Sequence, residues 1–245
     1  LLLKELTALC GYPKSTVFGL LTTMRAYDVV TQTPDGRYTL GLRLFEYGRQ
    51  VERSWDISTV ARPYMEHLCR QTGASVMLSV CEGGSVITLD QVETRGSLRV
   101  VSDTGSRLPI YCTSQGKVFL AHMSRTGAEA LLRGQSRNQF TPHTITDIPT
   151  LLREVEACRA NGYAIENGEY KIGLRSISAP VYNVEGVVQY TVGVIGMFRS
   201  VHSEEFHGAV EQVCATAAMI SAALGYRRRE EHGGAPAKTA PGTSV

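Results

Sequence analysis

The chain has 245 residues, a mass of 26.7 kDa and a formal net charge of +2. Hydrophobic residues make up 43% and charged residues 20%, an ordinary globular composition that excludes a disordered chain and allows one or two domains with buried cores. The near-neutral charge favours no particular partner, because a nucleic-acid-binding domain usually has a clear basic bias.

The sequence indicates a cytoplasmic protein with reduced thiols. No secretory signal opens the chain, and the longest strongly apolar stretch, 187–198, is shorter than the roughly 18 residues of a membrane helix. The cysteines form no Cys-x-x-Cys pair and the histidines lack metal-ligand spacing. We therefore expect free thiols, no membrane contact, no metal and no cofactor. The cysteines are Cys10, Cys69, Cys81, Cys112, Cys158 and Cys214.

The first 26 residues have the pattern of two short helices joined by a tight turn. Leucines recur at helical spacing before Gly11, and a second apolar face follows Pro13, a residue favoured at the start of a helix. Only Cys10-Gly11-Tyr12 lies between them, which predicts a helix-turn-helix. The apolar faces are Leu2, Leu6 and Leu9 in the first helix, and Val17, Leu20, Leu21 and Met24 in the second.

A β-hairpin is predicted directly after these helices. Two β-prone runs, 29–32 and 37–40, flank Pro34-Asp35-Gly36, and Asp-Gly between such runs is a strong hairpin signal. Residues 1–40 therefore predict a winged helix-turn-helix, whose first helix is expected upstream of Leu1.

A linker helix and a larger domain are expected next. Helical spacing predicts the linker over 41–54, and Ser58 is expected to cap the following helix. Alternating strands and helices predict an α+β domain over 55–226 with a largely antiparallel sheet. The tail, 227–245, is expected to be disordered. The predicted strands are 75–80, 86–92, 98–102, 163–166, 177–182 and 187–196, and the predicted helices are one ended by Gly73, 114–123, 149–159 and a final helix capped by Ser203.

The exposed side of the second helix suits DNA reading. Its first-turn N–H groups and polar side chains match phosphate or base contacts in a major groove, and the wing would reach a neighbouring groove or phosphate. The alternative is a helical subdomain that contacts protein, which the near-neutral charge favours. The candidate DNA-binding residues are Lys14, Ser15, Thr16, Phe18, Thr22, Arg25 and Arg37.

Motifs in both predicted domains resemble the isocitrate-lyase-regulator (IclR) family of bacterial transcription factors. Their order and spacing together, more than any one motif, make the resemblance specific over residues 1–226. In the first domain they are the run 13–24 and Arg37-Tyr38-Thr39-Leu40-Gly41. In the second they are Gln91-Val92, Gly105-x-x-Leu108-Pro109, Gly116-Lys117-x-Phe119-Leu120-Ala121, Gly162-Tyr163, Glu169, Gly173-Leu174-Arg175 and Ala179-Pro180-Val181.

The resemblance implies a winged-helix domain, a linker helix and an effector-binding domain related to the GAF fold. Members act as homodimers or tetramers on palindromic double-stranded operator DNA, and they repress or activate under the control of small organic acids or aromatic metabolites. The family usually has arginine where Gly19 stands here. Because glycine lacks that contact, we expect Phe18, Thr22 and Arg25 to carry more of the base readout.

A candidate effector site lies at the start of the helix predicted over 114–123. Unpaired N–H groups at a helix start bind carboxylates, aided by the helix dipole. On the residues alone, a start capped by Thr113 with no ligand is the alternative; the resemblance implies an effector carboxylate on the backbone N–H groups of Ser114 and Gln115. Tyr111 or Arg99 would meet a ring or a second polar group. Other positions that match the family's pocket are Val100, Leu108, Glu166, Leu174, Ser176, Gly193 and Ile195, and for Glu166 the alternative is a solvated strand end.

The last predicted strand suggests which kind of acid binds. Family members that bind small polar acids have Ser-x-Ser-Gly where this chain has Gly193-Val194-Ile195-Gly196. The loss of two hydroxyls and of one whole side chain predicts a roomier and less polar pocket. We therefore expect an aromatic carboxylate, such as a benzoate or hydroxybenzoate, and not pyruvate or glyoxylate.

No motif of an enzyme is present. The sequence lacks a Gly-x-Ser-x-Gly elbow, a P-loop and Gly-x-Gly-x-x-Gly. Cys112 has no identifiable base, and the odd spacing of Glu166 and Glu169 would place them on opposite faces of a strand. We expect a ligand-responsive transcriptional regulator of a catabolic operon. The alternatives are a GAF-like sensor whose winged helix contacts protein and, less favoured, a small-molecule enzyme.

Overall fold

The computed structural model describes residues 1–54, 56–94 and 104–227 of the chain. The chain forms two compact units that divide between Ile57 and Ser58, close to the boundary expected at residue 54. The predicted strand 98–102, with Arg99 and Val100, lies outside the described residues, as do residues 228–245 of the predicted tail. A search of the described helices finds none long and apolar enough to cross a membrane.

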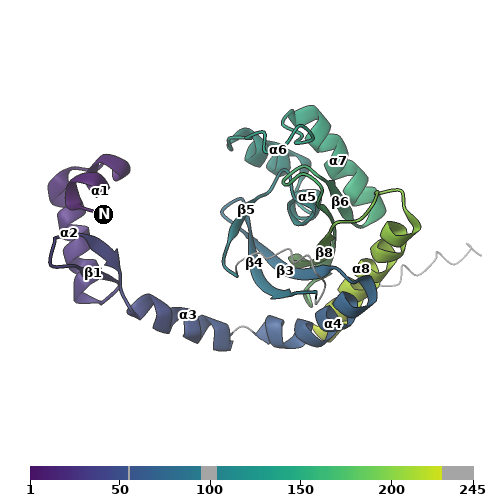
Figure 1. Cartoon of the computed structure of the whole chain (residues 1–245), viewed down its shortest axis with the longest axis horizontal. Coiled ribbons are helices and arrows are strands. Elements are labelled where there is room, and N and C mark those ends of the chain that lie inside the picture. The colour runs from purple at the N-terminus through teal and green to yellow at the C-terminus, as the bar shows by residue number, and fades with distance from the viewer. Residues whose placement is uncertain (55, 95–103, 228–245) are drawn as a thin grey trace, which may run out of the picture. The chain divides into compact units, whose positions relative to one another are not determined.

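The N-terminal unit consists of two helices, a hairpin and a third helix in the predicted order (Figure 1). The first helix ends at Gly11, whose φ of 68° is left-handed and therefore suits glycine. Pro13 is the N-cap of the second helix and not its first helical residue. This arrangement confirms the helix-turn-helix and its wing. The elements are α1 (Leu3–Cys10), α2 (Lys14–Ala26), β1 (Val30–Gln32), β2 (Tyr38–Leu40) and α3 (Arg43–Ser54).

A small apolar core joins the two helices to the hairpin. Val17 and Leu21, one helical turn apart on α2, are buried with Tyr38 of the wing. The expectation that Leu20 and Met24 share this buried face was wrong, because their side chains are 51% and 43% exposed. They lie on the neighbouring stripe of α2, which is about half exposed.

The second unit is built on a six-stranded sheet with strand order β5-β4-β3-β8-β7-β6. Every described pair of neighbouring strands is antiparallel, which confirms the predicted sheet type and the α+β class. The strands are β3 (Ser75–Glu82), β4 (Ser85–Val92), β5 (Arg107–Pro109), β6 (Ala164–Asn167), β7 (Arg175–Tyr182) and β8 (Val188–Gly196). The helices are α4 (Asp56–Thr72), α5 (Ser114–Ala121), α6 (Arg125–Arg133), α7 (Ile148–Asn161) and α8 (Glu204–Ala223).

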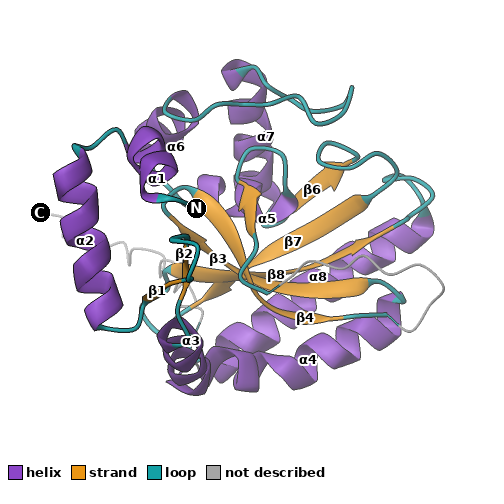
Figure 2. Cartoon of the chain, turned by 60° about the vertical axis from the view of Figure 1, so that its left-hand side comes forward, coloured by secondary structure: helices purple, strands orange, loops and turns teal. Residues whose placement is uncertain are grey.

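Helices cover both faces of this sheet (Figure 2). One face carries α5, with α6 and α7 packed around it, and the other carries α8 and α4. Successive side chains of a strand point to opposite faces. On β8, Val192 and Val194 therefore face away from α5, whereas Thr191, Gly193 and Ile195 lie on the α5 face.

Several elements differ from the sequence expectation at their ends. Helix α4 begins at Asp56, so Ser58 lies within its first turn and is not the N-cap. Strand β5 and helix α6 were not predicted: β5 has only three residues, and α6 begins at a Ser124 cap that the pattern analysis missed. The caps of α7 at Asp147 and of α8 at Ser203 accept backbone N–H groups, and all six cysteines are free.

Two glycines of the N-terminal unit make a matched stability test. We expect Gly19→Ala to raise the free energy of unfolding by about 0.5–1 kcal/mol, because Gly19 lies inside α2 and a Cβ there meets nothing within 4 Å. Gly41→Ala should lower stability by more than about 1 kcal/mol, because its Cβ would lie 2.0 Å from the carbonyl oxygen of Asp28. Urea unfolding followed by circular dichroism measures both, and shifts of the same sign would contradict this packing.

Candidate functional site

The candidate DNA-binding residues all lie on the exposed surface of α2 and the wing. Three of them also make local contacts. The Thr22 hydroxyl donates to the carbonyl oxygen of Phe18 at 2.8 Å, and Arg25 donates to the Gln32 side chain of β1 at 2.9 Å. Arg37 forms an ion pair with Asp35 at 3.1 Å, so the charge at the wing tip is partly neutralised. The hydroxyl of Thr33 and the Arg37 guanidinium both lower the pKa of Asp35.

In the second unit, α5 begins inside the protein. All eight of its residues are buried, and its N-cap Thr113 accepts the N–H of Gly116 at 3.2 Å while donating to the carbonyl oxygen of Pro109. A Cβ on Gly116 would lie 2.0 Å from the carbonyl oxygen of Ile110, so only glycine allows this close approach. Thr113 therefore caps the helix as the simpler interpretation held. Within the described residues, the backbone N–H groups of Ser114 and Gln115 have no hydrogen-bond acceptor.

A chain of hydroxyls links the start of α5 to the sheet. The Ser114 hydroxyl lies 2.9 Å from that of Ser176 and 2.8 Å from that of Ser178, both on β7. Ser176 in turn donates to Glu166 of β6 at 3.1 Å. The structure thus brings Ser114, Ser176 and Glu166 together. The sequence analysis missed Ser178, although its position two residues after Ser176 places it on the same face of the strand.

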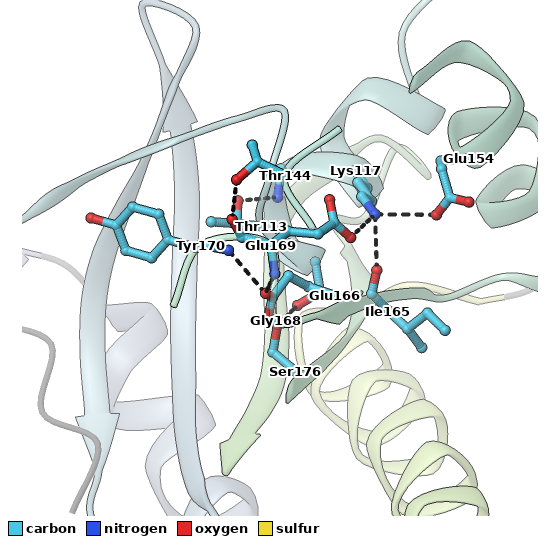
Figure 3. Close-up of polar contacts among 12 residues, drawn as sticks. Thr113, Lys117, Thr144, Glu154, Ile165, Glu166, Gly168, Glu169, Tyr170 and Ser176 are labelled. Atoms are coloured by element: carbon cyan, nitrogen blue, oxygen red, sulfur yellow. Dashed lines mark hydrogen bonds and ion pairs between the residues drawn. The ribbon is translucent and has the colours of Figure 1, made fainter. Parts of the chain in front are cut away.

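Glu166 is buried, so the alternative of a solvated strand end was wrong. Its carboxylate accepts the backbone N–H groups of Glu169 at 2.5 Å and Tyr170 at 3.1 Å, besides the Ser176 hydroxyl (Figure 3). Burial raises the pKa of Glu166 above its ordinary value, while these hydrogen bonds oppose that shift. Glu166 therefore fixes the turn after β6 against the start of α5.

A buried lysine holds the next part of this turn. Lys117 of α5 is 2% exposed, and its ammonium lies 2.6 Å from Glu169, 3.1 Å from Glu154 and 3.3 Å from the carbonyl oxygen of Ile165 (Figure 3). Burial lowers the pKa of Lys117, but the two carboxylates outweigh burial and leave it above its ordinary value. The expectation that Glu166 and Glu169 lie on opposite faces of one strand was wrong, because β6 ends at Asn167 and the chain turns there.

Gly193 does not open the wall of the site as expected. A Cβ at this position would lie 2.2 Å from the Ser178 hydroxyl and 2.3 Å from the carbonyl oxygen of Ile177, so the space is already filled. Nor is this face poor in hydroxyls, because Ser176 and Ser178 of the neighbouring strand supply them. The reasoning from the lost side chain to a roomier, less polar pocket was therefore wrong.

The remaining predicted effector residues lie at different depths. Tyr111 is 2% exposed in the core around α5, and its hydroxyl donates to the carbonyl oxygen of Asn138 at 2.8 Å, so it has a partner other than a ligand. Leu108 on β5, Leu174 just before β7 and Ile195 on β8 are half-buried. Ile195 pairs with Ser176, which places it beside the hydroxyl chain.

Two features bear on rival chemistry. Burial raises the pKa of Cys112 to about 12, which leaves its thiol unreactive near neutral pH. Across the part of the chain that is described, no group of three His, Cys, Asp or Glu residues could hold a metal ion.

On the α8 side of the sheet, a separate groove of about 600 Å³ is lined by small and aromatic side chains, among them Ala179, Tyr182, Cys214, Ala217, Ser221 and Tyr226.

Comparison with known proteins identifies the family. The family described as "Bacterial transcriptional regulator IclR C-terminal" matches residues 49–222. The HTH-type transcriptional regulator XynR of Escherichia coli K12 is 31% identical over 223 residues, which cover 91% of this chain and 88% of XynR. The crystal structure of Thermotoga maritima IclR is 28% identical, has a TM-score of 0.70 and is covered over 92% of both chains.

A further solved structure shares the fold. It is an IclR homologue from Microbacterium hydrocarbonoxydans complexed with 4-hydroxybenzoate, 23% identical, with a TM-score of 0.72 and coverage of 91% of this chain and 90% of that one. Together, the fold and the relatives define a ligand-responsive transcriptional regulator of the helix-turn-helix type, not an enzyme. The chain belongs to the IclR family of bacterial transcriptional regulators.

The buried ion pair gives a direct test of what holds the site together. Lys117→Met should lower the free energy of unfolding by about 3–5 kcal/mol, because it leaves Glu169 buried without its partner. The double variant Lys117→Met/Glu169→Gln should be more stable than Lys117→Met alone. Urea unfolding measures both values. If the double variant is instead less stable than Lys117→Met, the two losses add, and the two groups do not depend on each other.

Proposed function

We propose that α2 and the wing bind operator DNA of a catabolic operon and that a small carboxylic acid, most favourably an aromatic one, controls this binding from the start of α5. The observation that carries the effector site is the pair of N–H groups on Ser114 and Gln115, buried at a capped helix start with no described acceptor. Such N–H groups favour an anion, and the helix dipole adds to the attraction. An acid carboxylate supplies the matching charge.

Apolar side chains support an acid with a flat hydrocarbon body. Ile195 and Leu174 are half-buried beside Ser176, and Met77 of β3 contacts the Gln115 side chain. Apolar walls with a few convergent polar groups are typical of small-molecule sites. The 4-hydroxybenzoate complex of the distant homologue shows that this fold is able to hold such an acid in that protein. For this chain, the aromatic effector remains our proposal.

Control of DNA binding would act through a homo-oligomer. Two reading helices of a dimer have to match the spacing of two operator half-sites, so a change in their relative orientation changes affinity. A dimer or tetramer would supply the two reading helices, and the linker helix α3 would transmit a change in their orientation. A coupling free energy of about 1–3 kcal/mol between the two sites would give roughly 5–150-fold control.

A proline substitution tests the N–H groups themselves. Ser114 is the first residue of α5, a position where proline is tolerated, and Thr113 before it is already extended. Ser114→Pro removes one N–H, and we expect the affinity for benzoate or 4-hydroxybenzoate to fall at least about tenfold, the equivalent of one charge-assisted hydrogen bond.

The matched control is Ser114→Ala, which removes the hydroxyl and keeps the N–H. Its affinity should stay within about threefold of the unsubstituted protein. Isothermal titration calorimetry measures all three proteins. Equal losses in both variants would assign the effect to the hydroxyl and would exclude the backbone anion site.

Charge and hydroxyl variants on α2 test the DNA surface. Lys14→Ala should weaken binding to all duplexes alike and reduce the slope of log K against log salt by about 1, as expected for a lost phosphate contact. Thr22→Ala should weaken operator binding more than binding to unrelated DNA, because a base contact carries specificity. Fluorescence anisotropy with duplexes from the region upstream of the regulator's operon measures both.

Arg153→Ala on α7 removes an equal charge from an exposed position of the other unit and should change neither affinity nor slope. If the unsubstituted protein shows no preference among duplexes at moderate salt, the alternative of a protein-contacting winged helix is favoured.

A further inference from the structure

The face of the sheet beneath α5 carries buried hydroxyls without partners. Ser75 and Ser79 of β3 and Thr191 of β8 are at most 1% exposed, and their side-chain oxygens make no hydrogen bond within the described residues. The strand register places them around the effector site. Ser75 pairs with Ile195, which pairs with Ser176, and Ser79 lies directly opposite Thr191.

Such groups are costly unless something completes their hydrogen bonds. A buried hydroxyl without a partner loses the water it bonded to in the unfolded chain and gains nothing in return. Three of them on one sheet face, next to a helix start with free N–H groups, indicate a compartment built for a polar occupant.

The side chain of Gln115 lies in the same compartment and is also poorly partnered. It is 4% exposed, and among the residues described its amide nitrogen donates only to the Met77 sulfur at 3.5 Å, while its amide oxygen accepts only from the Ser114 hydroxyl at 3.4 Å. A thioether is a weak acceptor, and an amide offers two donors and two lone pairs. Most of its hydrogen-bonding capacity is therefore unused.

The Gln115 amide also lies over the central strands of the sheet, close to Gly193. Met77 and Ser178 lie on either side of Gly193 in the strand register, and the Gln115 and Ser114 side chains contact one of them each. Because Gly193 has no side chain, the Ser178 hydroxyl fits beside it. The Gln115 amide lies over Met77, on the other side of Gly193. The amide is next to the backbone N–H groups proposed to bind the carboxylate.

We propose that the Gln115 side-chain amide is a specificity determinant that recognises a hydroxyl group on the effector, in addition to the carboxylate held by the backbone. This inference rests on the proposed effector site at the start of α5. A hydroxyl both donates and accepts, which matches an amide with free donors and a free lone pair. The neighbouring Ser75, Ser79 and Thr191 hydroxyls complete a polar wall for it.

A neutral group fits this compartment better than a second carboxylate. The Lys117 ammonium is already paired with Glu169 and Glu154, and Glu166 adds a buried carboxyl close to Ser114 and Ser176. A second anion would be repelled by these groups and would bring an unpaired charge into a buried site. The effector is therefore a hydroxy acid with a single carboxylate.

Calorimetry on the full chain with benzoate and its 2-, 3- and 4-hydroxy derivatives tests the inference. The unsubstituted protein should bind at least one hydroxybenzoate about tenfold or more tightly than benzoate. Gln115→Leu should bring that preference to within about twofold, because leucine offers the effector hydroxyl no donor or acceptor. The control Gln189→Leu, at an exposed position of β8, should retain the full preference.

Each other outcome overturns the inference in a recognisable way. A hydroxybenzoate preference that persists in Gln115→Leu, or that is absent from the unsubstituted protein, overturns the role of Gln115 and leaves the carboxylate site intact. Failure of all four acids to bind overturns both the inference and the aromatic effector. If thermal unfolding shows that Gln115→Leu does not fold, Gln115→Asn withdraws the amide by one methylene and is judged by the same loss of preference.

Discussion

Helix α5 starts in the interior of the second unit, and the N–H groups of its first turn have to find acceptors there. The neighbouring residues meet part of this need. Thr113 caps one N–H group, and Gly116 allows the helix to approach Ile110 closely. Free N–H groups in a buried position are costly. The carboxylate of the proposed effector would remove that cost by accepting from these N–H groups.

The charged groups behind the helix keep this arrangement rigid. Lys117 connects α5 to α7 through Glu154 and to the turn after β6 through Glu169, while Glu166 holds the same turn by its backbone. A ligand that contacts Ser114 therefore touches a network that includes two helices and two strands. Such a network provides a physical route by which occupancy of the proposed site would alter this unit as a whole.

Much of this architecture could be predicted from the sequence, because its signals are local. The structure has the elements that correspond to the two short apolar faces, to the Asp35-Gly36 turn and to the Ser203 cap. The site was predicted less completely. Ser178 and Met77 lie beneath the start of α5 because β3, β8 and β7 are neighbours, and strand order is not readable from one chain. Gly193 misled for the same reason, since the side chain that fills its space comes from another strand.

The most direct test of the central claim follows the backbone amides of Ser114 and Gln115 by nuclear magnetic resonance in isotope-labelled full-length protein. On titration with 4-hydroxybenzoate, this account predicts that these two amide proton signals move furthest, downfield as expected for N–H groups that gain an anionic acceptor, and saturate together. Unchanged signals at both residues would contradict it, most clearly if the signals that move belong to the groove between β7 and α8.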